Sequence, residues 1–312
     1  MFEGKWNWRD LSRVIPLYDI ANNPFLPWDL EGISENYTVT VDAILNLVLP
    51  NCTGTWNWAS VSQHISMAEV REYPNMPWNR DTLSLNRGIQ LNDILYMRLV
   101  HAVGDWNWNY ISQRVSLTVV AQHPDQPWNR EGLSRNNTLT VNDIVNLDLP
   151  CATGNWNWNS ISSHIDLSQV EQNPDQPWNR VSLSMNRDIT LSDVQNLSLP
   201  NATGSWNWFY LSMFIHMSEV RQHPDLPWNR EGLSQNATIT MSDVTDLTLP
   251  NAVGQWNMLL LMEEIPIVDV YRYPSVDWNR EYLSNNAGIR VSDLMTWEEF
   301  LLSDTDLDKI KL

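Results

Sequence analysis

The sequence repeats itself every 50 residues, with no insertion or deletion between repeats. Two tryptophan phrases mark each repeat, one close to W-N-W and one close to P-W-N. A fixed period of this kind predicts a repeat array rather than a set of unlike domains. We therefore expect one solenoid over residues 1–300, followed by a capping tail at 301–312. Its six repeats are 1–50, 51–100, 101–150, 151–200, 201–250 and 251–300.

The spacing of apolar and polar residues predicts several short helices in each repeat. In the fourth repeat, Trp156 and Ile161 flank Asn157, and the same spacing recurs three more times. An apolar residue before a capping Asn, Asp or Thr, with another apolar residue five positions later, is typical of a helix start. Four helices should start near repeat positions 7, 16, 29 and 40. The fold class is therefore all-α, with about twelve two-helix units that need packing on neighbours because each helix is short.

The two rows of tryptophans are expected to form the core of this solenoid. A tryptophan buries on the order of 200 Å², more than any other side chain, and short helices offer few core positions. The predicted core consists of Trp6, Trp28, Trp56, Trp78, Trp106, Trp128, Trp156, Trp178, Trp206, Trp228, Trp256 and Trp278.

Two further repeat positions suggest a ladder of ion pairs. The first repeat carries Leu30 and Ala43 where the later ones carry an arginine and an aspartate. A charge that disappears together with its opposite suggests a pair, because one buried charge without its partner is costly. Divergence of the first repeat as an end cap is the alternative. The candidate pairs are Arg80 with Asp93, Arg130 with Asp143, Arg180 with Asp193, Arg230 with Asp243 and Arg280 with Asp293.

The formal charge of −18 and the pI near 4.5 argue against a nucleic-acid partner, which would require a basic surface. No stretch is apolar over enough residues to span a membrane, and the first residues do not form a signal peptide. Cys52 and Cys151 lie in different repeats at unequal positions, so no structural disulfide is expected between them.

No catalytic, cofactor or metal site is expected, because the chain repeats the same groups instead of gathering unlike ones. The serine after each leucine, as at Ser34 and Ser84, is expected to be a small residue that lets helices approach closely. Asp304, Asp306 and Asp308 resemble the start of a calcium loop but lack its central glycine. Sugar binding by exposed indoles, such as Trp8 and the equivalent tryptophans of later repeats, is a less favoured alternative.

The phrases resemble a known group of repeats. WNREGLSRNNTLT at 128–140 and QNPDQPWN at 172–179 are similar to the tryptophan-rich repeats W-[DN]-W-x2-L-S-x-N and N-P-x2-P-W in proteins of large eukaryotic DNA viruses. The likeness covers residues 4–297, although each repeat here is a strict doublet with a shortened first half. The family carries no defined activity, so the resemblance implies a viral origin and a structural or host-interaction role.

These observations together predict a non-enzymatic scaffold that binds proteins along an extended surface, either capsid proteins or copies of itself. The resemblance implies a minor capsid or virion component, located in the virion or the host cytoplasm. The main alternative is a host-interaction module with one target. A final amphipathic helix, containing Trp297, Phe300 and Leu301, is expected to cap the last repeat.

Overall fold

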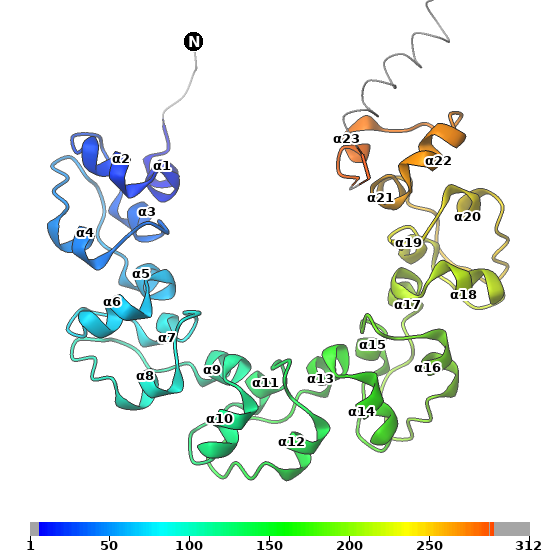
Figure 1. Cartoon of the computed structure of the whole chain (residues 1–312), viewed down its shortest axis with the longest axis horizontal. Coiled ribbons are helices and arrows are strands. Elements are labelled where there is room, and N and C mark those ends of the chain that lie inside the picture. Colours follow the sequence, from blue (N-terminus) through cyan, green and yellow to red (C-terminus); the bar gives the residue numbers. More distant parts are fainter. Residues whose placement is uncertain (1–5, 287, 290–312) are drawn as a thin grey trace, which may run out of the picture. The chain divides into compact units, whose positions relative to one another are not determined.

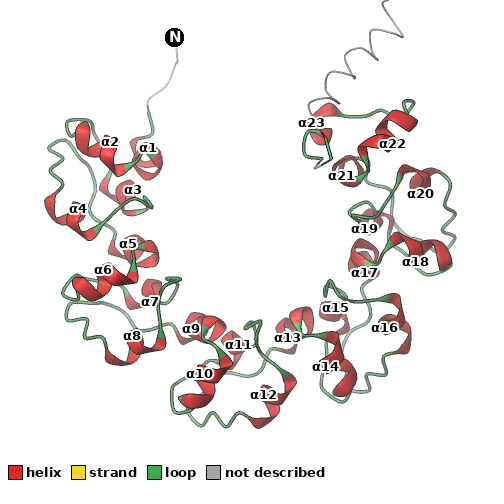
Figure 2. Cartoon of the chain, viewed as in Figure 1, coloured by secondary structure: helices red, strands yellow, loops and turns green. Residues whose placement is uncertain are grey.

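The computed structural model describes residues 6–286 and 288–289. Backbone contacts divide the chain into two compact units, Met1–Asn157 and Trp158–Leu312, and each is described by itself. The described residues form 23 helices and, apart from isolated parallel bridges, no strand (Figure 2). The predicted all-α solenoid with a 50-residue period is confirmed.

Each complete repeat contributes four helices in the same order. The first helices are α1 (Trp8–Val14), α5 (Trp58–His64), α9 (Trp108–Arg114), α13 (Trp158–His164), α17 (Trp208–Phe214) and α21 (Met258–Glu264). The second are α2 (Leu17–Asn22), α6 (Met67–Glu72), α10 (Leu117–Gln122), α14 (Leu167–Gln172), α18 (Met217–Gln222) and α22 (Ile267–Arg272). The third are α3 (Leu30–Ser34), α7 (Arg80–Leu83), α11 (Arg130–Leu133), α15 (Arg180–Leu183), α19 (Arg230–Leu233) and α23 (Arg280–Leu283). The fourth are α4 (Val41–Asn46), α8 (Leu91–Tyr96), α12 (Val141–Asn146), α16 (Leu191–Asn196) and α20 (Met241–Thr245).

The helices begin where the capping pattern places them. Asn107, for example, precedes α9 and its side chain accepts hydrogen bonds from the N–H groups of the first turn. Thr140 precedes α12, and Thr140 and Asp143 form a reciprocal capping box. Such caps satisfy the N–H groups that a helix start leaves without partners. The expected fourth helix of the last repeat and the expected capping tail lie outside the described residues.

Within each unit the helices form two rows (Figure 1). In the first unit, α1, α3, α5, α7, α9 and α11 follow one edge, while the second and fourth helices of the repeats follow the other. The first and third helices of a repeat pack on each other, as α1 does on α3. Trp8 and Trp28 meet there edge to face, with ring centroids 5.4 Å apart. Four later repeats contain the same pair, so one indole of each W-N-W phrase braces the buried indole of the next phrase.

The tryptophans of the P-W-N phrases, which form the second row, are part of the core as expected. Trp28 is 2 % exposed, and Trp78, Trp128, Trp178 and Trp228 are fully buried. Each of these indoles donates its N–H to the backbone carbonyl five residues earlier, so the polar edge of the ring is satisfied as well. Trp278 makes the same bond but is only half-buried.

The first tryptophans of the W-N-W phrases, which form the first row, are less buried than predicted. Its members in repeats two to six are half-buried, namely Trp56, Trp106, Trp156, Trp206 and Trp256. Trp6 is 70 % exposed, so its assignment to the core is wrong. The later tryptophans directly precede an asparagine whose N–H is bonded to the preceding repeat. Among the described residues, the N–H of Asn7, which follows Trp6, has no such acceptor.

Candidate functional site

Successive repeats are joined by a hydrogen bond from an asparagine N–H to a buried serine hydroxyl. In the first junction, the N–H of Asn57 donates to Ser34 Oγ at 2.9 Å, and Ser34 is fully buried. The same hydroxyl donates to the Leu30 carbonyl, so both of its roles are used. The equivalent bonds join Asn107 to Ser84, Asn157 to Ser134, Asn207 to Ser184 and Asn257 to Ser234.

A matching bond joins the two halves of each repeat. The N–H of Asp29 donates to Ser12 Oγ at 2.9 Å, and asparagines do the same in the next four repeats. In the sixth repeat a methionine replaces this serine, and the N–H of Asn279 faces Met262 Sδ at 3.3 Å. The serines were expected only to be small, and their role in connecting the units was not predicted from the sequence.

A buried asparagine completes each two-helix unit. The Asn36 amide donates to the carbonyls of Ser12 and Ile15, which close the preceding first helix. Its oxygen accepts from Thr38. The positions equivalent to Asn36 are also buried, at Asn86, Asn136, Asn186, Asn236 and Asn286. The two serines and this asparagine recur at fixed repeat positions, and that recurrence is the feature of the sequence that could have predicted the network.

The predicted ion-pair ladder is wrong, because the arginines bind backbone carbonyls instead. The Arg80 guanidinium donates to the carbonyls of Leu99, Ala102 and Gly104. Gly104 has a φ of 72°, which glycine adopts without strain, and this turn aims its carbonyls at the arginine. The next three repeats show the same contacts for Arg130, Arg180 and Arg230.

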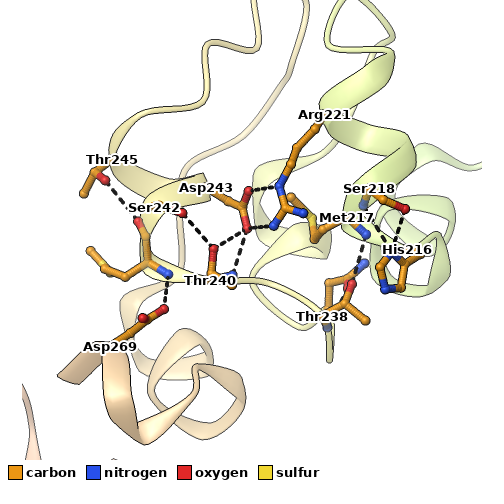
Figure 3. A network of polar contacts seen from close by, with 12 residues as sticks. His216, Met217, Ser218, Arg221, Thr238, Thr240, Ser242, Asp243, Thr245 and Asp269 are labelled. Atoms are coloured by element: carbon orange, nitrogen blue, oxygen red, sulfur yellow. Dashed lines mark hydrogen bonds and ion pairs between the residues drawn. The ribbon is translucent and has the colours of Figure 1, made fainter. Parts of the chain in front are cut away.

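The aspartates of the predicted ladder bind capping residues and other arginines instead. Asp143 and Asp193 accept from the capping threonines Thr140 and Thr190. Asp93 pairs with Arg71 at 2.8 Å. The Asp243 partners are Arg221 and Thr240 (Figure 3), and Asp293, the expected partner of Arg280, lies outside the described residues.

Asp243 is the best-defined charged group of this set. It is 2 % exposed, and burial alone would raise the pKa of its carboxyl. Hydrogen bonds from Arg221 and Thr240 outweigh burial and hold the pKa of Asp243 below its ordinary value. Two N–H groups of Arg221 reach the two carboxylate oxygens at 2.6 and 2.7 Å, which is the bidentate arrangement.

Acidic side chains also cross two of the junctions between repeats. Glu69 Oε1 accepts from the N–H of Val41, the first residue of α4 in the preceding repeat. Asp269 does the same for the first residue of α20, the N–H of Met241, at 2.9 Å (Figure 3). Both acids occupy repeat position 19, and in the third repeat that position is Val119. Valine has no acceptor, so the junction between the second and third repeats is built differently.

A hollow of about 450 Å³ lies at this junction. Arg87, Ile89 and Leu91 line it from the second repeat, and Ile111, Arg114 and Val119 from the third. A larger hollow of about 1150 Å³ shares the two arginines and extends to Arg13, Tyr37 and His64. Burial lowers the pKa of His64, which favours its neutral form. The combination of residues that lines these hollows does not recur at the other junctions. Only the third repeat combines arginine at position 14 with valine at position 19.

A hollow of about 480 Å³ is lined by Trp106 and Trp108 beside Asp81 and Asp105. Among the described residues no group of three or more His, Cys, Asp or Glu side chains could hold a metal ion. No helix in the described part of the chain is long and apolar enough to cross a membrane.

Comparison of the chain with protein families, curated proteins and solved structures finds no match. The fold itself defines the class of the protein, an α-solenoid repeat protein with a 50-residue unit.

Proposed function

We propose that this chain is a non-enzymatic scaffold that binds other proteins along its repeats, as a minor component of the particle of a large DNA virus. The observation that carries the proposal is the serine–asparagine bond at every junction from the first to the fifth. It keeps the same connection between repeats while exposed side chains differ from one repeat to the next. A repeat protein of this kind presents many small contact sites on one backbone.

The viral setting rests on the resemblance of the W-N-W and P-W-N phrases to repeats of such viruses. The unvarying repeat length supports a structural role, because no insertion builds a separate site within any repeat. The charge of −18 favours basic protein partners over nucleic acid.

Quantitative mass spectrometry of purified particles tests the proposal. A structural component should be present at a fixed copy number relative to the major capsid protein, and extensive washing should not change that ratio. Absence from particles, together with a single cross-linked target in infected cells, would favour the host-interaction module instead.

A further inference from the structure

The junction between the second and third repeats carries an unusual local charge. Arg87 and Arg114 are both exposed, and neither forms an ion pair with any described residue. Arg114 is held in place by a hydrogen bond to the Leu85 carbonyl. Two guanidinium groups without a carboxylate partner among the described residues lie on one hollow, in a chain with 19 basic and 37 acidic residues. They favour an anionic ligand at a place where the rest of the molecule would repel one.

The lining also has an apolar part. Ile89, Ile111 and Val119 are at most half-exposed and face the same hollow as the arginines. In the adjoining hollow, Arg13 adds a third guanidinium, although it also pairs with Asp10, and Glu35 there is bound to Arg9. A ligand that fits both hollows therefore needs carboxylates near the arginines and aliphatic groups between them. A peptide meets this requirement better than a small anion, because it can follow two adjoining hollows at once.

The chain itself contains such a segment. Residues 302–308 read LSDTDLD, with three aspartates, two leucines and no basic residue. We propose that this segment of a second copy of the chain binds the hollow at the junction between the second and third repeats. The hollow and the segment are different surfaces, so the contact joins copies either head to tail or by reciprocal exchange of the segment. The proposal rests on the scaffold function and names one of its partners.

The acidic residues at two other junctions indicate which substitution would fill the hollow. Glu69 and Asp269, at the position of Val119, bind the backbone of the preceding repeat and so fill the space between repeats. Val119→Glu should place a carboxylate toward the start of α8 in the same way. It would occupy the hollow, neutralise one of the arginines and prevent the segment from binding.

Sedimentation velocity of the full chain over a range of concentrations tests the proposal. We expect self-association that weakens as salt rises from about 50 to about 500 mM, because ionic contacts are screened. Arg87→Ala with Arg114→Ala should weaken association about tenfold or more, as should Asp304→Asn with Asp306→Asn and Asp308→Asn. Val119→Glu should do the same. Arg187→Ala is the matched control, since Arg187 occupies the position of Arg87 in the fourth repeat and its loss should leave association unchanged.

Charge reversal separates binding from misfolding. A chain with Arg87→Glu and Arg114→Glu, and another with Asp304→Lys, Asp306→Lys and Asp308→Lys, should each be monomeric and should associate when mixed. A monomeric wild-type chain at all concentrations, or association that none of these variants changes, would overturn the proposal. A monomeric chain that is still present at fixed copy number in particles would overturn this inference alone and leave the scaffold function standing.

Discussion

Asn107 and Ser84 are 23 residues apart and in different repeats, yet the Asn107 N–H donates to the Ser84 hydroxyl at 2.9 Å. Asn107 also caps α9, so one residue both starts a helix and fixes it to the preceding repeat. The same double role recurs at Asn57, Asn207 and Asn257, and it helps to explain how helices of four to seven residues remain folded.

Ser84→Ala should destabilise the protein by about 1–3 kcal/mol, because it leaves the part-buried N–H of Asn107 without its acceptor. Urea unfolding measures the change. Ser198→Ala is the control, since Ser198 is exposed, and should lie within about 0.5 kcal/mol of wild type. Equal stability of the two variants would show that the serine bond contributes nothing.

The two tryptophan rows should differ in how much each indole contributes to the free energy of unfolding. Trp128→Ala removes a fully buried indole and should cost roughly 3–5 kcal/mol. Trp6→Ala removes an indole that is 70 % exposed and should cost less than about 1 kcal/mol. Thermal and urea unfolding of both variants checks the prediction, and a large loss for Trp6→Ala would contradict the exposed position of that ring.

Gly132→Ala should destabilise the contact between α9 and α11. A Cβ at this position would lie 2.2 Å from the Asn109 carbonyl oxygen, so the two helices would have to separate. Overpacking of this kind costs about 1–3 kcal/mol. Alanine normally stabilises helices relative to glycine, so a higher melting temperature for this variant would refute the close approach.

The bond between Arg221 and Asp243 predicts a pH dependence. Because the pKa of Asp243 is lower in the folded than in the unfolded state, its contribution is complete above the unfolded value near 3.8. It is lost as the pH falls from there through the folded value. Unfolding in urea between about pH 7 and pH 2 should therefore show a steeper acid loss for wild type than for Asp243→Asn. Parallel curves would contradict the assignment.

Oligosaccharides should leave the tryptophan fluorescence unchanged, because five of the six P-W-N indoles are buried and the second W-N-W indoles pack against them. A saturable change upon titration, lost in Trp106→Ala, would instead favour the glycan-binding alternative at the hollow beside Trp106 and Trp108.

The helix starts and most of the buried tryptophans could be predicted, because the residues that determine them lie close together in the sequence. The N-caps, such as Asn107 and Thr140, and the buried tryptophans, such as Trp128, follow from spacing within a few residues. The ladder of ion pairs failed because the partners of Arg80 are carbonyl groups, which every residue carries and which leave no trace in the sequence.

The junction hollow was equally hidden from the sequence. It depends on the combination of Arg87, Arg114 and Val119 across two repeats, and their proximity follows only from the packing of those repeats. Trp6 was misplaced for a related reason: the later tryptophans of its row adjoin an asparagine that is bonded to the preceding repeat, and spacing within one repeat does not indicate that bond.

Amide hydrogen exchange of the W-N-W asparagines tests the central claim most directly. The N–H groups of Asn57, Asn107, Asn157, Asn207 and Asn257 all donate to a serine of the preceding repeat, while that of Asn7 has no such partner in the described part of the chain. These five amides should exchange about a thousandfold or more slowly than that of Asn7, as amides in a cooperatively folded core do. Exchange as fast as that of Asn7 would contradict the serine bonds that hold one repeat to the next.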